Sequence, residues 1–144
     1  MKKIDSFWDS SALVPLCANQ SSSLLARTAL KSKSVTVWWG TPVEMTAALC
    51  RLLRDGHLSR RQFESAMNRL EALRQGWVEV APTERLRRLA ETLLERHALR
   101  AADALQLAAA LVWSGERPRQ RQFVCLDRRL AEAAGKEGFQ VATL

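Results

Sequence analysis

Hydrophobic and polar positions change their period repeatedly along this chain, and this pattern predicts strands that alternate with helices. Apolar, aromatic or β-branched runs predict strands over residues 5–9, 35–39, 77–80, 123–126 and 139–144. Helical spacing fills most of the chain between them, in segments that begin near residues 11, 24, 41, 59, 83, 101 and 128. The alternation favours an α/β fold in which a mostly parallel sheet of four or five strands is covered by helices on both faces.

Three of the predicted elements have a distinct character. Residues 83–97 place leucines on one side and charged residues on the other, as an amphipathic surface helix does. Residues 101–113 are apolar nearly all round, which predicts a buried helix. Residues 123–126 form a continuous apolar run of the kind found in a buried parallel strand.

Length and composition favour a single domain over residues 1–144. Apolar residues make up 47% of the chain, which argues against disorder, and no apolar run approaches the roughly 20 residues that span a bilayer. The amino terminus carries basic residues but no sustained apolar segment after them, so no secretory signal is expected. Cys17, Cys50 and Cys125 fit neither a disulfide framework nor a zinc site, and we expect reduced thiols in a cytoplasmic protein.

The chain is basic, with 22 Lys and Arg against 15 Asp and Glu and a formal net charge of +7. This charge favours a polyanionic partner, although a solvated positive surface explains it as well. Arg117, Arg119 and Arg121 fall in one predicted loop and are candidate phosphate contacts. If they bind phosphates, replacing all three with Gln would flatten the salt dependence of RNA binding.

Four acidic residues stand out by their place in this pattern. Asp9 and Asp127 each follow a predicted strand, whereas Glu44 and Asp103 each fall near the start of a predicted helix. Taken singly, most have a structural explanation. Asp9 and Asp127 can cap the helices that follow them. Thr41 and Glu44 fit a capping box at the start of their helix.

Asp103 is harder to explain in this way, because its neighbours are small and apolar. An ionised carboxylate buried there costs several kcal/mol unless it is paired or bound to a metal. Arg100, three residues earlier, is the alternative partner. The first turn of a helix also favours a negative charge.

Together, the four acids suggest a metal site. Acids at the ends of strands and the starts of helices are expected to crowd the carboxyl edge of one sheet, where α/β proteins bind ligands. Carboxylates that lie close together repel, and without help some of them become protonated. A divalent cation relieves the repulsion, and hard oxygen ligands select Mg²⁺ or Mn²⁺.

The motifs around these acids resemble those of PIN-domain ribonucleases, and their order and spacing are most similar to the VapC toxins of bacterial toxin–antitoxin pairs. The resemblance covers nearly the whole chain. The four motifs are FWDSSALV around Asp9, PVE ending at Glu44, RAADALQLA around Asp103 and VCLDRRL around Asp127.

The resemblance implies a PIN-like three-layer α/β/α fold and a Mg²⁺-dependent endoribonuclease. Asp9, Asp103 and Asp127 would hold the metal, and Glu44 would act directly or through water. Ser11 would orient a ligand or water beside Asp9. Cleavage would leave a 5′-phosphate and a 3′-hydroxyl. Relatives of this kind are commonly homodimers that a small antitoxin inhibits by covering the acidic site.

The chain departs from the family pattern in two ways. Cys125 stands where the family usually has a hydroxyl residue two positions before the fourth acid. Trp8, Trp38 and Trp39 make the chain more aromatic than the motifs require. These tryptophans are expected to pack in the core or, as an alternative, to stack on unpaired bases beside the site.

Two other functions are compatible with parts of the pattern. A catalytically inactive RNA-binding or protein-interaction module would keep the fold and the basic surface, but it has no reason to keep four mutually repelling acids. A phosphatase that forms an aspartyl-phosphate on Asp9 would need a second Asp two residues later, where this chain has Ser11. The endoribonuclease therefore accounts for the most residues.

Overall fold

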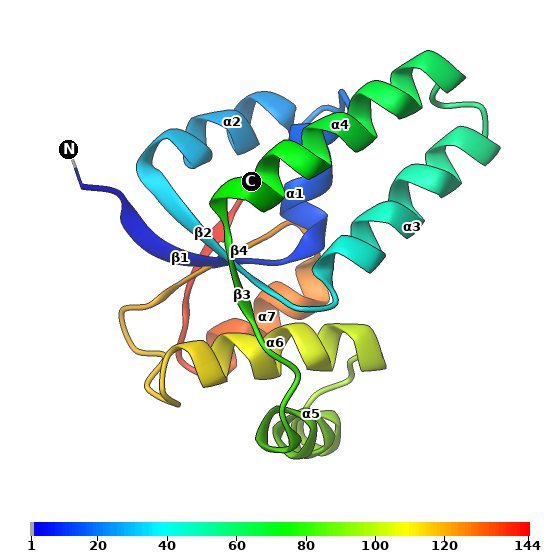
Figure 1. The fold of residues 1–144 in the computed structure, drawn as a ribbon. Helices are drawn as coiled ribbons and strands as arrows, with labels where there is room; N and C mark the ends of the chain where they lie inside the picture. The colour runs from blue at the N-terminus through cyan, green and yellow to red at the C-terminus, as the bar shows by residue number, and fades with distance from the viewer. Residues whose placement is uncertain (1) are drawn as a thin grey trace.

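The computed structural model describes residues 2–144, in which five strands form one sheet and all pairs of neighbouring strands run parallel (Figure 1). The strands are β1 (Ile4–Trp8), β2 (Lys33–Trp38), β3 (Val78–Val80), β4 (Gln122–Cys125) and β5 (Gln140–Thr143). The helices are α1 (Ser10–Cys17), α2 (Ser23–Ser32), α3 (Thr41–Arg54), α4 (Arg60–Gly76), α5 (Glu84–Arg96), α6 (Ala101–Trp113) and α7 (Arg128–Lys136). The predicted α/β fold is confirmed.

The strand order, β3-β2-β1-β4-β5, brings two distant parts of the chain together. The first half of the chain adds β2 and β3 on one side of β1, and the second half adds β4 and β5 on the other side. The order therefore reverses between β1 and β4. In open parallel sheets, the crevice beyond the carboxyl ends of two such strands is the usual place for a ligand.

Successive residues of the central strands face opposite layers of the protein. Phe7 and Phe123 belong to one buried cluster, whereas their neighbours Trp8 and Val124 belong to the other. This period of two is what a strand buried on both faces requires. The two aromatic residues before Asp9 therefore anchor the end of β1 from both sides.

Helices cover both faces of the sheet. The first cluster packs beneath α5, α6 and α7, and the second packs beneath α1 to α4, on the opposite side of the sheet (Figure 1). Residues 107–110 of α6 have no exposed surface, which confirms the prediction of a buried helix. The long helices α3 and α4 lie side by side and extend from the sheet as a hairpin (Figure 1).

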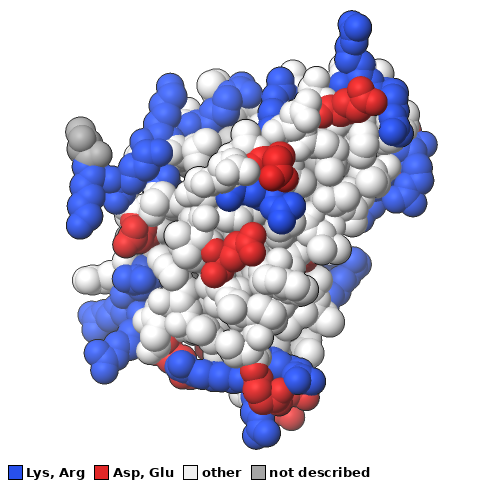
Figure 2. Space-filling model, in the orientation of Figure 1, with Lys and Arg blue, Asp and Glu red and all other residues white. Residues whose placement is uncertain are grey.

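Two further expectations concern the whole chain. Cys17, Cys50 and Cys125 are free cysteines, and the first and last of them are buried. None of the helices found in residues 2–144 is long and apolar enough to cross a membrane. In the view of Figure 2, Lys and Arg side chains gather along the margins of the molecule, and both acidic and basic side chains also lie near its centre among uncharged residues.

Candidate active site

The carboxyl edge of β1 and β4 brings Asp9 and Asp127 together. The backbone N–H of Asp9 donates to the carbonyl of Val124 at 3.0 Å, so the pairing of the two strands continues to the first acid. Asp127 follows β4 by two residues and begins α7. Asp103 and Glu44 lie in the first turns of α6 and α3. The four predicted acids thus lie at one end of the sheet.

Asp9 is the most buried of these acids, with 3% of its surface exposed. Its Oδ2 accepts hydrogen bonds from the backbone N–H of Ser11 at 3.1 Å and from the Ser11 hydroxyl. Burial, together with the charges of Asp103 and Asp127, raises the pKa of Asp9 from 3.8 to about 6. The Ser11 hydrogen bonds oppose this shift. Asp9 is therefore both the cap of α1 and one of a group of interacting carboxylates.

Ser11 connects the ends of the two central strands. Its hydroxyl donates to Asp9 and accepts from the backbone N–H groups of Leu126, at 3.0 Å, and Asp127, at 3.3 Å. One side chain thereby holds the first acid and orders the backbone that carries the fourth. Ser11 lies next to Asp9, as the sequence led us to expect, and it also orients the segment after β4.

Asp127 caps α7, since its Oδ1 accepts from the backbone N–H of Leu130 at 2.9 Å. The thiol of Cys125 is directed at the carbonyl of Asp127, with the sulfur 3.1 Å from the oxygen. Burial raises the pKa of Cys125, so the sulfur stays protonated and can donate. Cys125 and Ser11 thus both make polar contacts with the backbone around Asp127.

Glu44 does not form the predicted capping box. The cap of α3 is Gly40, and Thr41 lies inside the helix with its side chain fully buried. Glu44 instead accepts a hydrogen bond at 2.5 Å from the amide Nε2 of Gln106, which also contacts the Thr41 hydroxyl at 3.2 Å. The prediction of a capping box was wrong, because Gln106 on α6 binds the side chains of both Thr41 and Glu44.

Burial raises the pKa of Glu44 from 4.5 to about 7. The hydrogen bond from Gln106 opposes this shift, and the charges of Asp9 and Asp103 add to it. Sequence reasoning missed Gln106, although it left a signal. It is the one polar residue between Ala104 and Ala110 of an apolar helix, three positions after Asp103 and hence on the same face.

Asp103 lines a pocket of about 510 Å³ together with Asp127 and three arginines. Burial raises its pKa, and the charge of Asp127 raises it further, whereas the backbone N–H of Arg100 and the charges of Arg100 and Arg129 lower it. Within residues 2–144, no Asp103–Arg100 ion pair is formed. Arg100 therefore acts on Asp103 through its backbone N–H and its charge rather than through an ion pair.

The acids fit a divalent cation in the kind of atom they offer. All are carboxylates, and Asp9, Glu44 and Asp103 have pKa values raised in part by neighbouring acids, a repulsion that a cation would relieve. In the described part of the chain, however, no three Asp, Glu, His or Cys side chains are arranged so that they could hold a metal ion together. Binding an ion would require these side chains to rotate toward one another.

The candidate phosphate contacts in the loop before β4 lie elsewhere. Arg117, Arg119 and Arg121 precede the amino end of β4, so the length of that strand, about 13 Å, separates them from the edge that carries the acids. Arg121 stacks over Trp113, with its guanidinium carbon 4.3 Å from the ring centroid. The structure does not bring this loop to the candidate site.

The tryptophans divide between the two roles considered for them. Trp8 is fully buried and Trp38 is 8% exposed, so both pack in the core. Trp39 follows the carboxyl end of β2 and is 55% exposed. Only Trp39, of these three, offers a ring to a ligand at this edge.

Solved structures share the fold of this chain. A toxin–antitoxin complex from Klebsiella pneumoniae matches over 96% of this chain and 96% of its own, with 15% identity and a TM-score of 0.64. VapBC2 from Rickettsia felis, bound to a DNA fragment from its promoter, matches over 97% and 98%, with 11% identity and a TM-score of 0.66. PAE2754 from Pyrobaculum aerophilum matches over 96% and 89%, with 21% identity and a TM-score of 0.61.

No protein-family model matches the chain, and no curated protein is significantly similar to it in sequence. At identities this low, likeness to solved structures shows the fold alone. The chain thus has the α/β fold of chains in these structures, with a five-stranded parallel sheet, as the resemblance to PIN domains implied.

Proposed function

We propose that this chain is a Mg²⁺-dependent endoribonuclease, with Mn²⁺ as a possible substitute. The observation that supports this most directly is electrostatic. Burial and mutual repulsion hold the pKa values of Asp9 and Glu44 at about 6 and about 7, although a protein gains no stability from carboxylates arranged in this way. Carboxylates that repel one another at the ligand-binding edge of a parallel sheet are what a cation site is expected to contain.

In this proposal Asp9, Asp103 and Asp127 hold the metal, and Glu44 acts directly or through water. A bound divalent cation would orient water toward the phosphodiester and stabilise the negative charge that develops there. Ser11 keeps Asp9 and the backbone of Asp127 in place. Hydrolysis by water would leave a 5′-phosphate and a 3′-hydroxyl.

We further propose that the chain is the toxin of a type II toxin–antitoxin pair. It would act as a homodimer and be inhibited by a small antitoxin that covers the acidic edge. Support comes from its likeness in fold to chains of toxin–antitoxin complexes from Klebsiella pneumoniae and Rickettsia felis.

The alternative is a catalytically inactive PIN-type module that binds RNA or protein. The formal charge of +7 fits either function, so charge does not separate them. The buried carboxylate of Asp9 does, because a module without a cation could replace it with an amide and avoid the cost of burying a charge.

The test is cleavage of a mixed pool of structured RNAs by purified, antitoxin-free protein, with Mg²⁺ and with a chelator. We expect cleavage that requires metal and is lost in Asp9→Asn. The exposed Asp55 provides the matched control, and Asp55→Asn should cleave like the wild type. Cleavage that persists in Asp9→Asn would point to another site or a contaminant. Folded protein that cleaves nothing would favour the inactive module.

A further inference from the structure

A second pocket adjoins the one that contains the acids, and Arg129 lines both. The first pocket, of about 510 Å³, is lined by Asp103, Asp127 and the arginines Arg100, Arg128 and Arg129. The second, of about 360 Å³, lies between the connection from α5 to α6 and the outer face of α7. Its cationic lining is Arg96, Arg129 and Lys136, with Glu132 as the one acid among its lining residues. Arg129 therefore lies where the two pockets meet.

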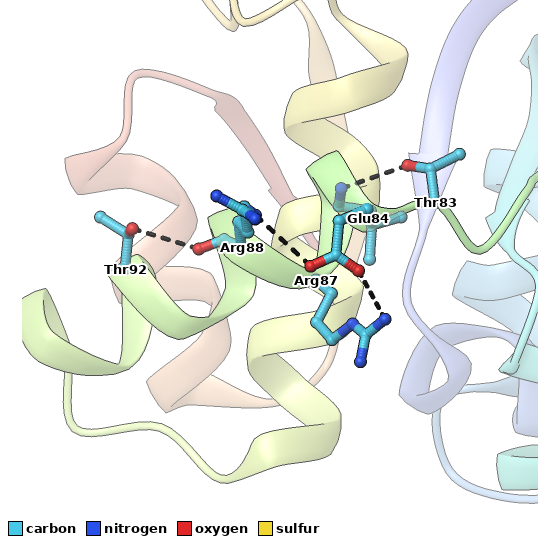
Figure 3. A network of polar contacts seen from close by, with 6 residues as sticks. Thr83, Glu84, Arg87, Arg88 and Thr92 are labelled. Atoms are coloured by element: carbon cyan, nitrogen blue, oxygen red, sulfur yellow. Dashed lines mark hydrogen bonds and ion pairs between the residues drawn. The ribbon is translucent and has the colours of Figure 1, made fainter.

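Arg100 and Arg129 of the first pocket act on Asp103 through their charge but form no close ion pair in the protein as described. Over residues 2–144, none of Arg100, Arg128 and Arg129 forms an ion pair. Helix α5 shows the contrast: Glu84 pairs with Arg87 and, at 3.4 Å, with Arg88 (Figure 3). Exposed arginines of this chain can thus find partners on their own helix, but the three beside the acids do not.

The first turn of α7 carries positive charges, although the helix dipole favours negative charges there. Arg128 and Arg129 occupy its first turn, which contains no acid. The positive end of the helix dipole disfavours cations there. The acids of the candidate site offset this cost, since Asp127 caps α7 and the charge of Arg129 acts on Asp103. The first turn of α7 thus places cations beside the acids.

Among the cations of the second pocket, Arg129 is the one that forms no ion pair within residues 2–144, although its charge also acts on Asp103. Arg96 pairs with Glu137 at 3.1 Å, and Lys136 pairs with Glu132 at 3.3 Å. His97 also contacts Glu137, with 2.6 Å between Nε2 and Oε2, which fixes the connection from α5 to α6 against α7. The walls of the pocket are therefore held by ion pairs, and Arg129 remains available to a ligand.

We propose that Arg129 binds a backbone phosphate of a single nucleic-acid strand, one step along from the phosphodiester at the acids, and that the strand continues into the second pocket. This proposal rests on the function proposed above. The planar guanidinium fork of arginine matches phosphate oxygens in shape and charge. A strand that carries one charge per nucleotide places a phosphate beside Arg129 whatever its sequence, whereas a peptide would need an acidic residue at that position.

The test measures the binding of a short, mixed-sequence, single-stranded RNA to protein in the Asp9→Asn background, with chelator, over a series of salt concentrations. Each phosphate contact on a single strand contributes about 0.7 to the slope of log affinity against log salt. We expect Arg129→Gln to lower the steepness of this slope by about 0.7 and Arg129→Lys to retain it. The matched control is Arg61→Gln on α4, an exposed arginine that lines neither pocket and forms no ion pair in the described chain.

Three outcomes would overturn the proposal. One is an unchanged slope in Arg129→Gln, and another is a loss no larger than that in Arg61→Gln. The third is an Arg129→Gln variant that loses binding to poly-glutamate while its RNA binding is unchanged, which would indicate an acidic protein partner instead.

The RNA-cleavage assay distinguishes a failure of this proposal from a failure of the proposed function. Metal-dependent cleavage by the wild type with an unchanged Arg129→Gln slope would reject the phosphate contact alone. A reduced slope without any cleavage would reject the nuclease and leave the phosphate contact standing.

Discussion

Asp9 shows how one residue serves the fold and the candidate site at once. One of its oxygens, Oδ2, caps α1 through Ser11, and no group in residues 2–144 donates a hydrogen bond to the other, Oδ1. Capping and metal binding were weighed against each other from the sequence, but they are compatible because a carboxylate has two oxygens. Asp127 follows the same pattern, since its Oδ1 caps α7.

The raised pKa of Asp9 predicts a dependence of stability on pH in metal-free protein. The folded state holds a proton up to a pKa of about 6, whereas the ordinary value is 3.8. The stability that this proton confers is complete below the ordinary value and is lost as the pH rises through the folded-state pKa. At higher pH the buried charge lowers the free energy of unfolding by up to about 3 kcal/mol.

Asp9→Asn removes that charge, so we expect it to stabilise the metal-free protein by about 1–3 kcal/mol at a pH well above the Asp9 pKa, and to have little effect at a pH near 3.8. Denaturant unfolding at the two pH values measures this. The control Asp55→Asn should change neither value. Destabilisation by Asp9→Asn at the higher pH would show that the carboxylate is structural.

At the scale of elements, the sequence predicted the strands and helices well because their patterns are local. The central strands are buried on both faces of the sheet, and the apolar helix 101–113 packs in one of the two clusters, so their residue patterns reflect their own burial. The contact between α3 and α6 was not predictable in this way. Gln106 and Glu44 are 62 residues apart, and only the folded chain makes the glutamine a better partner for Glu44 than the start of its own helix.

This contact makes Gln106 a positioning residue for Glu44, and Gln106→Leu tests it. The hydrogen bond from Gln106 lowers the pKa of Glu44, so its loss should raise that pKa above about 7 and shift the pH profile of RNA cleavage upward. We expect cleavage to fall by about 10- to 100-fold, as it does when groups that orient metal ligands are removed. We expect a moderate loss of stability, because Glu44 and the buried Thr41 hydroxyl lose their donor, and this loss is partly offset by removal of the unpaired buried Oε1 of Gln106.

The matched control for this prediction is Gln75→Leu, at the exposed end of α4, which should behave as the wild type. Reduced cleavage in Gln106→Leu with an unchanged pH profile would contradict a role through Glu44. It would point instead to a general effect on the packing of α6.

At the scale of the whole molecule, the topology decides which charged residues can act together. The strand order places residues 9 and 127 at neighbouring positions, and the sequence predicted this correctly from the rule that parallel strands share a carboxyl edge. It could not predict that Arg117 and Arg119 lead into the amino end of β4, far from the acids, while Arg128 and Arg129 follow its carboxyl end. All four are basic and close in sequence, but the direction of one strand separates them.

The central claim is that the acids at this edge bind a divalent cation, and calorimetric titration of Mn²⁺ or Mg²⁺ into purified protein tests it most directly. The account predicts saturable binding by the wild type and by Asp55→Asn, and an affinity weaker by about tenfold or more in Asp9→Asn. Folded wild type that binds no cation, or an Asp9→Asn variant that binds as tightly as the wild type, would contradict it.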